Sequence, residues 1–123
     1  QIFGDYEGAI YLRNYDGDTI TFNLPNLHPI IGKKIAVRVN GIDTPEISGK
    51  CDKEKYDAEQ AKVMVEGLLK DAERIDLKNL KRGKYFRIVA DVYVDGENLA
   101  EALVDSGMAV RYNDGKKNAR WCK

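Results

Sequence analysis

The sequence contains few residues of several kinds, and each shortage limits what the chain can be. It has two cysteines, three prolines and one histidine among its 123 residues. No hydrophobic run reaches the roughly 18 to 20 residues needed to span a bilayer, so we expect no membrane partner. The one histidine, His28, cannot supply a pair of catalytic imidazoles or a histidine-rich metal centre. Any chemistry must therefore rest on other side chains.

The chain also lacks an excess of charge of either sign. Twenty basic and twenty acidic side chains give a formal net charge of zero. A tight, nonspecific binder of duplex nucleic acid is normally strongly basic, and the totals do not indicate that class. If the chain binds a polyanion, local clusters of cations must provide the contacts.

The remaining composition is typical of a small globular domain. Hydrophobic residues make up 43% of the chain and charged residues 33%. Because we find no repeat, linker or low-complexity tract, we expect one domain over residues 1–123, and a monomer. The chain begins at Gln1 rather than Met, so we also expect a processed or trimmed product.

Cys51 and Cys122 lie far apart in the sequence, and three states are open for them. They are two free thiols in a reducing compartment, a disulfide in an oxidising one, or zinc ligands together with His28. A disulfide would close a loop of about 70 residues and add about 4 kcal/mol of stability through chain entropy. The zinc site is the least favoured, because no two candidate ligands have the usual short spacing.

Hydrophobic periodicity predicts five strands and two clear helices. Alternation marks strands over residues 7–13, 20–24, 35–39, 75–77 and 88–94, with turns at Asp16-Gly17 and Asp95-Gly96 and a loop over 25–29. Helical spacing follows Asp52, a candidate N-cap, through Ala61, Met64, Val65, Leu68 and Ala72; a short helix follows Asn98 and ends at Gly107. This order predicts an α+β domain, a five-stranded OB-fold β-barrel with two to three packed helices.

The most informative stretch is Arg38 to Glu46, where a strand carrying an arginine leads into a tight turn with two carboxylates. Val37 and Val39 occupy one face of this strand, so Arg38 lies on the other face and stays accessible. In the turn Asp43-Thr44-Pro45-Glu46, one carboxylate can bind a divalent metal while the other accepts a proton. Two further segments complete the pattern: Asp16-Gly17-Asp18-Thr19 upstream and Lys84-Tyr85-Phe86-Arg87 downstream.

These segments resemble the active-site signature of the thermonuclease family, the staphylococcal nuclease-like enzymes. The resemblance covers roughly residues 16–112 and is strongest where Arg38 precedes Asp-Thr-Pro-Glu by five residues. It implies that Asp18, Asp43 and the backbone carbonyl of Thr44 bind calcium. It also implies that Glu46 is the general base and that Arg38 and Arg87 are the phosphate-binding pair. The substrate-binding positions it implies are Lys84, Tyr85 and Tyr112.

The residue types suit phosphodiester hydrolysis. Charge gathers on the phosphate oxygens in the transition state, and arginine pairs with such oxygens through a planar fork that stays protonated. Oxygen ligands favour a hard cation such as calcium. The sequence departs from the family pattern at Phe86, where the family commonly has a glycine that can adopt positive φ. It also ends soon after Tyr112, so we expect the long terminal helix of some family members to be absent or shortened.

Each segment also has a plainer explanation: a hairpin turn at Asp16-Gly17, a turn before a helix at Asp43, a solvated basic loop beside Arg87. Their joint occurrence in the family order favours function. We expect a secreted or periplasmic, calcium-dependent nuclease that hydrolyses DNA and RNA without sequence specificity and prefers single strands. The alternative is a catalytically inactive OB-fold module that binds nucleic acid. A structural or inhibitory surface protein, indifferent to divalent ions, is a third possibility.

Overall fold

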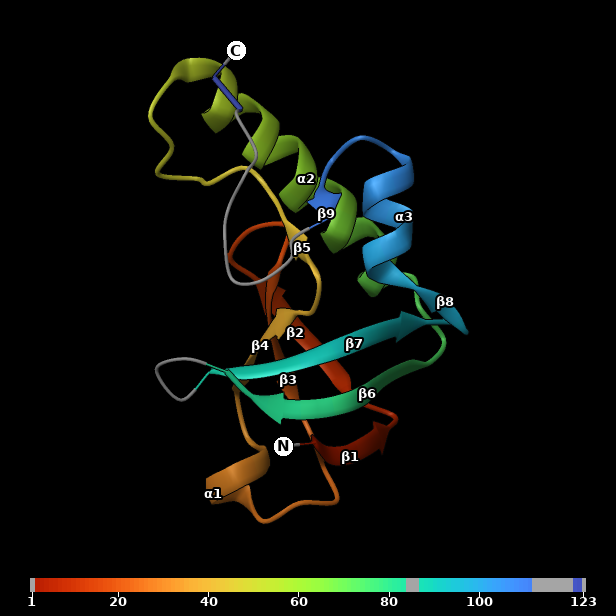
Figure 1. Cartoon of the computed structure of the whole chain (residues 1–123). Coiled ribbons are helices and arrows are strands. Elements are labelled where there is room, and N and C mark those ends of the chain that lie inside the picture. The colour runs from red at the N-terminus through yellow and green to blue at the C-terminus, as the bar shows by residue number, and fades with distance from the viewer. Residues whose placement is uncertain (1, 84–86, 112–120, 123) are drawn as a thin grey trace.

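Figure 1 shows a computed structural model of the chain, which describes residues 2–83, 87–111 and 121–122. The main sheet contains β1 (Ile2–Glu7), β2 (Ile10–Asn14), β3 (Thr19–Asn23), β4 (Ile35–Val39), β6 (Ile75–Arg82), β7 (Ile88–Val94) and β8 (Glu97–Asn98). A separate pair is formed by β5 (Ile42–Asp43) and β9 (Val110–Arg111). The helices are α1 (Pro29–Gly32), α2 (Asp52–Lys70) and α3 (Leu99–Asp105).

The α+β class is confirmed, but the predicted closed barrel is wrong for the described residues. The sheet runs in the order β1-β6-β7-β4-β3-β2, with β8 beside β7, and no ladder joins β2 back to β1 in this part of the chain. Gly8 and Ala9 connect β1 to β2, and their N–H groups both donate to the carbonyl of Ile75, the first residue of β6. Contacts then form between β2 and α2. Alternation within strands predicts faces, but it does not determine whether the outer strands meet.

The core lies on one face of this sheet, beneath α2 and α3 (Figure 1). Val37 and Val39 are buried while Arg38 lies on the opposite face, as the alternation predicts. The helix α2 begins one residue earlier than expected: Cys51, not Asp52, is its N-cap. Its buried face contains Ala61, Val65 and Leu69, whereas the predicted core residue Leu68 is exposed and Ala72 lies beyond the helix.

The predicted turns are confirmed. Asp95 and Gly96 both have positive φ and connect β7 to β8 in a tight hairpin, as an Asp-Gly pair favours. Asn98 caps α3 through a hydrogen bond from the Glu101 N–H to its side chain. At the other end Gly107 has a φ of 81°, and its N–H donates to the Val104 carbonyl. This is the left-handed C-terminal turn that glycine permits at low cost.

The structure decides between the states that the sequence leaves open for the cysteines. Cys51 and Cys122 form a disulfide with a Cα–Cα distance of 5.9 Å across a separation of 71 residues. His28 is not a zinc ligand; its Nδ1 accepts a hydrogen bond from the Ile30 N–H at the start of α1, a short helix that begins at Pro29, the last residue of the predicted loop. Within the described residues no helix is long and apolar enough to cross a membrane.

Candidate active site

The hairpin between β2 and β3 holds Asp18 in place through Asp16. Asp16 Oδ1 accepts hydrogen bonds from the backbone N–H groups of Asp18 at 3.1 Å and Thr19 at 2.8 Å. A short acid that bonds to N–H groups two and three residues ahead forms an Asx turn, so the local sequence determines this shape. Both carboxylate residues are buried.

Asn14 fastens the same hairpin to the long helix. Its side-chain amide donates to the backbone carbonyls of Asp16 and of Lys62 on α2, both at 3.0 Å. Because Asn14 and Lys62 are 48 positions apart in the sequence, this amide fixes the hairpin relative to the helix. The position of Asp18 therefore depends on packing as well as on the local turn.

Arg38 and Asp18 form the central ion pair of the site. Arg38 Nη1 lies 2.8 Å from Asp18 Oδ2, with side-chain exposures of 13% and 10%. The second nitrogen of the fork, Nη2, donates to the Ile42 carbonyl at 3.0 Å. The guanidinium thus joins the β2–β3 hairpin to the first residue of β5. Two segments that the sequence places 20 positions apart are brought into contact here.

Asp43 and Thr44 are buried beside that hairpin. Asp43 lies on β5, paired with Val110 of β9, and Thr44 follows it. A Cβ at Gly17 would lie 2.9 Å from Thr44 Cγ2 and 3.0 Å from Ala61 Cβ. Contacts this short are essentially never observed, so only glycine lets the hairpin approach Thr44 and α2 so closely. The structure thereby brings together the segments that carry Asp18, Asp43 and Thr44.

The electrostatics of these buried acids suit a cation. Burial, then the charge of Asp18, raises the pKa of Asp16 to about 7. Thr44 Oγ1 is buried without a hydrogen-bond partner among the described residues. A divalent ion would offset the clustered negative charge, and carboxylate and carbonyl oxygens are the ligands that calcium prefers. Among the described residues, no group of three His, Cys, Asp or Glu side chains lies close enough together to hold a metal ion without other ligands. Water would therefore complete the coordination.

Arg87 immediately precedes β7, the strand that pairs with the strand of Arg38. The parallel pairing of β4 with β7 sets Arg38 beside Val89, and Arg87 precedes Val89 by two residues. The Gly83 N–H donates to the Arg87 carbonyl at 2.7 Å, which extends the backbone pairing of β6 with β7 by one residue. The register therefore brings together the segments that carry the two predicted phosphate-binding arginines, although 49 positions separate them in the sequence.

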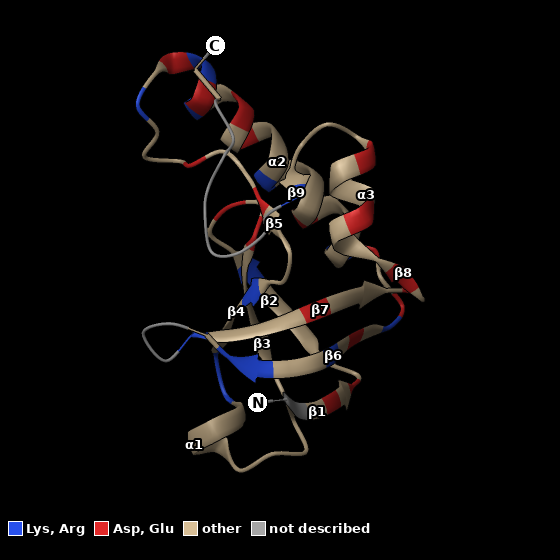
Figure 2. Cartoon of the chain, viewed as in Figure 1, with Lys and Arg blue, Asp and Glu red and all other residues tan. Residues whose placement is uncertain are grey.

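Basic residues gather where β4 and β7 begin and β6 ends (Figure 2). This basic edge consists of Lys33, Lys34, Lys81, Arg82 and Arg87. Because the chain has no net positive charge, it can bind a polyanion only where cations cluster locally, and this basic edge is such a cluster. The predicted substrate residues Lys84, Tyr85 and Tyr112, and the unusual Phe86, lie outside the described residues.

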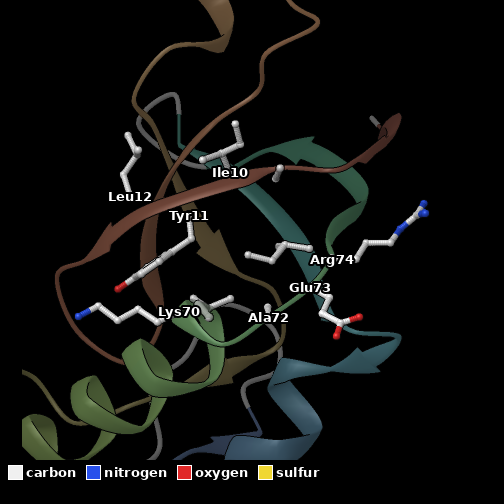
Figure 3. A pocket seen from close by; sticks show the side chains of 10 residues that line it. Ile10, Tyr11, Leu12, Lys70, Ala72, Glu73 and Arg74 are labelled. Carbon is white, nitrogen blue, oxygen red and sulfur yellow. The ribbon is translucent and has the colours of Figure 1, made fainter.

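A separate cavity of about 380 Å³ lies between β2, the end of α2 and the start of β6 (Figure 3). Ile10, Tyr11 and Leu12 line one side, and Lys70, Glu73 and Arg74 another. None of the predicted site residues lines it. Arg74 is already paired with Glu7 and Asp76. The candidate active site is therefore the region around Arg38 and Asp18, not this cavity.

A model of the family described as "Staphylococcal nuclease homologue" matches residues 36–121, well over half of the chain. The chain belongs to the staphylococcal nuclease family. The resemblance noted in the sequence is thus confirmed, and the matched range includes the predicted residues Arg38, Asp43, Thr44, Glu46 and Arg87. Asp18 lies upstream of it.

Among the curated relatives that the chain resembles at moderate identity, two are named as staphylococcal-like nucleases. The staphylococcal-like nuclease CAN1 of Arabidopsis thaliana is 32% identical over 97 residues, which cover 75% of this chain and 27% of that protein. The probable staphylococcal-like nuclease CAN1 of Oryza sativa subsp. japonica is 29% identical over 126 residues, covering 97% and 35%. An uncharacterized 38.1 kDa protein of Capnoides sempervirens is 28% identical over 99 residues, covering 80% and 27%. The chain spans about a quarter to a third of the length of these relatives.

Sequence reasoning missed three residues of this nuclease-family site: Asn14, Asp16 as a hydrogen-bonding residue, and Glu54. An acid followed by Gly-Asp-Thr is an Asx-turn signal, so Asp16 could have been found. Glu54 is the third residue after the N-cap Cys51, the spacing of a capping box, so it too had a local signal. Asn14 had none, because its partner Lys62 is distant in the sequence.

Proposed function

We propose that the chain is a calcium-dependent nuclease that hydrolyses phosphodiester bonds of DNA and RNA without sequence specificity. The observation that carries the proposal is the Arg38–Asp18 ion pair at 2.8 Å, which places a guanidinium beside buried acids on a strand paired with β7, the strand that follows Arg87. Family membership supports a nucleic-acid substrate. Two relatives named as staphylococcal-like nucleases support hydrolysis.

In the proposed reaction, Glu46 takes a proton from the water that attacks phosphorus, the ester P–O bond to the leaving sugar oxygen breaks, and that oxygen takes up a proton from solvent. Arg38 and Arg87 stabilise the charge that develops on the phosphate oxygens, and their planar forks orient the ester for attack. Each such electrostatic donor is worth roughly 10²- to 10³-fold in turnover, and a general base adds roughly 10²- to 10⁴-fold. Glu46 is partly buried and three residues from Asp43, so its segment borders the acids of the site.

Calcium would be held by Asp18, Asp43 and the backbone carbonyl of Thr44. When bound, it supplies positive charge that polarises a phosphate oxygen and offsets the buried carboxylates. Arg38 has a second role in this arrangement, because its ion pair with Oδ2 holds the Asp18 carboxylate in position. The Asx turn of Asp16 keeps the Asp18 backbone in register with β3.

Single-stranded substrates fit this surface better than a closed duplex. The chain has no net positive charge to grip a duplex broadly, whereas the basic edge offers five cations to one flexible backbone. Lys84, Tyr85 and Tyr112 are proposed as further substrate contacts by the family resemblance. The Cys51–Cys122 disulfide supports a secreted or periplasmic location, because such bonds persist in oxidising compartments.

A cleavage assay with a 5′-labelled single-stranded DNA tests the proposal. We expect the wild-type chain to cut the strand in calcium and to stop when a chelator is added. Glu46→Gln keeps the size of the side chain but removes the base, and it should lose about 10²- to 10⁴-fold in turnover. Glu59→Gln, an exposed acid on α2, is the matched control and should cut at the wild-type rate.

The same assay separates the nuclease from a binding module. Cleavage that needs both calcium and Glu46 supports the nuclease. Retained binding of the strand without cleavage, measured by fluorescence anisotropy, would identify the chain as an inactive nucleic-acid-binding module. Absence of both binding and cleavage would refute both functions.

A further inference from the structure

The loop that carries Glu46 is built around one buried carboxylate, that of Glu54 on the first turn of α2. Glu54 Oε2 accepts a hydrogen bond from the backbone N–H of Glu46 at 3.1 Å. Its other oxygen, Oε1, accepts one from the N–H of Lys50, also at 3.1 Å. Glu54 is only 8% exposed. A single side chain therefore holds both ends of residues 46–50, here called the 46–50 loop.

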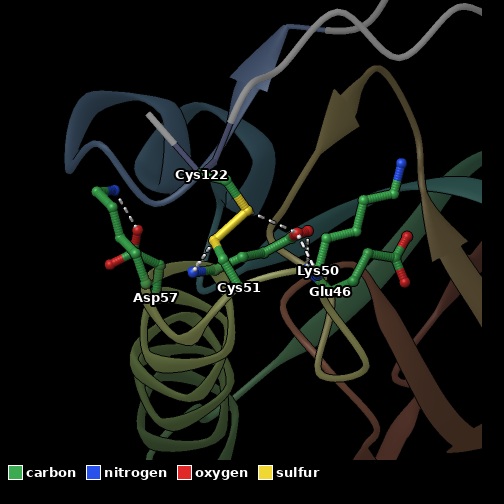
Figure 4. Close-up of a disulfide and its surroundings, with 7 residues drawn as sticks. Glu46, Lys50, Cys51, Asp57 and Cys122 are labelled. Carbon is green, nitrogen blue, oxygen red and sulfur yellow. Dashed lines mark hydrogen bonds and ion pairs between the residues drawn. A yellow bond between two sulfur atoms is a disulfide. The ribbon is translucent and has the colours of Figure 1, made fainter.

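The backbone of the 46–50 loop is in direct contact with this side chain. The N–H of Gly49 donates to the Glu46 carbonyl at 3.0 Å, which closes a tight turn. A Cβ at Gly49 would lie 2.6 Å from both Cγ and Cδ of Glu54, so no larger residue fits without moving the loop. In Figure 4 the side chains of Glu46 and Lys50 extend away from the disulfide.

The disulfide encloses the Glu54 carboxylate on the other side. Cys51 Sγ accepts the Glu54 N–H at 3.4 Å, and Cys122 Sγ lies 3.8 Å from Glu54 Oε1 (Figure 4). The positive end of the α2 dipole further favours a carboxylate in the first turn. Loop, helix terminus and disulfide thus converge on one carboxylate, and that carboxylate binds the backbone of the proposed general base directly.

We propose that Glu54 is a positioning residue for Glu46: by binding the backbone at both ends of the 46–50 loop, it holds the general base at the distance and angle that proton abstraction needs. The inference rests on the proposed function, since it assumes that Glu46 is the base. A carboxylate is required because both partners are N–H donors and each needs an acceptor. Glutamine offers one acceptor and sets its own N–H₂ against the other donor.

Glu54→Gln should therefore lower kcat about 10- to 100-fold while KM stays within about twofold of wild type, because a shift of about 1 Å in a catalytic group costs about 10²-fold. Kinetics are measured on single-stranded DNA in saturating calcium, well below the melting temperature of each variant. Val92→Ala, a core truncation on β7 away from the loop, controls for lost stability alone. It should keep the wild-type kcat.

A double-mutant cycle distinguishes positioning from a general structural effect. If Glu54 acts through Glu46, then Glu54→Gln added to Glu46→Gln should lower kcat no further, because the base is already gone. Multiplying losses would overturn the proposal, as would a wild-type kcat in Glu54→Gln. Should Glu54→Gln fail to fold, Gly49→Ala replaces it in the cycle, since the added methyl group displaces the same loop and leaves every acid intact.

The two hypotheses fail in different ways. A wild-type chain that cuts nothing refutes the proposed function. A wild-type chain whose cleavage depends on Glu46, but whose kcat is unchanged by Glu54→Gln, refutes only the positioning role of Glu54.

Discussion

The two arginines assigned to the phosphate differ in their contacts with the rest of the protein. This difference predicts that replacing one lowers both activity and stability, whereas replacing the other lowers activity alone. Arg38 is mostly buried and bonded to both Asp18 and the Ile42 carbonyl, whereas Arg87 is exposed and immediately precedes β7. Replacing either with glutamine should remove a cation from the reacting phosphate. Only the change at Arg38 should also weaken the fold.

The contacts set the expected size of each effect. Arg38→Gln leaves the largely buried Asp18 carboxylate without its ion-pair partner, which costs about 3 kcal/mol once some solvent exposure is allowed for. For a domain of this size that corresponds to a fall of about 10 °C in Tm. Arg87→Gln changes an exposed residue and should cost less than about 0.5 kcal/mol. Both variants should lose about 10²- to 10³-fold in kcat.

Thermal melts followed by circular dichroism give the stability of each variant, and cleavage of single-stranded DNA gives kcat. Both are measured in the same buffer, and the melts are repeated with a chelator because calcium also binds beside Asp18 in the proposed site. Arg38→Lys is the informative intermediate. Its ammonium can still meet the Asp18 carboxylate, so it should recover much of the lost stability but little of the bidentate phosphate binding.

Two results would refute this reasoning. Equal losses of Tm in Arg38→Gln and Arg87→Gln would mean that the Asp18 ion pair does not stabilise the fold as its burial implies. Full cleavage activity in both variants would mean that neither guanidinium faces the substrate. Full activity in one of them would remove only that arginine from the mechanism.

Two further predictions concern the disulfide and the buried acids. Complete reduction of the Cys51–Cys122 bond, verified by mass, should lower stability by about 4 kcal/mol and Tm by about 15 °C, because the bond spans 71 residues of chain; an unchanged Tm would contradict this. Without metal, the raised pKa of Asp16 means that the folded state keeps a proton that the unfolded state releases near pH 4. The contribution of Asp16 to the stability of the fold is therefore complete below pH 4, and it is lost as the pH rises toward about 7. Urea titrations across that range in chelator should show a smaller decline in Asp16→Asn, which keeps the two backbone acceptor bonds, and a slope equal to wild type would contradict the assignment.

Local sequence signals were sufficient for most elements. The alternation around Val37 correctly placed Arg38 on the face opposite Val37 and Val39, but the expected accessibility is wrong, because the Asp18 pair leaves its side chain only 13% exposed. Asp95-Gly96 and Asn98 correctly marked a hairpin and a helix cap. Errors arose where a local pattern had two readings. Asp52 looked like the N-cap because it is a common capping residue, but the Cys51 side chain makes the bond, and its geometry is set by the bridge to the C-terminal segment.

The order of residues along the chain determined which side chains were available: an arginine on an outward strand face, acids in two tight turns and a glutamate at the third position of a helix. Those are short-range facts, fixed by backbone geometry over a few residues. Tertiary packing alone decided that Arg38 meets Asp18, that the strand of Arg38 pairs with the strand following Arg87, that the sheet stays open within the described residues and that Glu54 binds the Glu46 backbone. Each of these depends on strand register or on contact between distant segments, which is settled by burying the whole core at once.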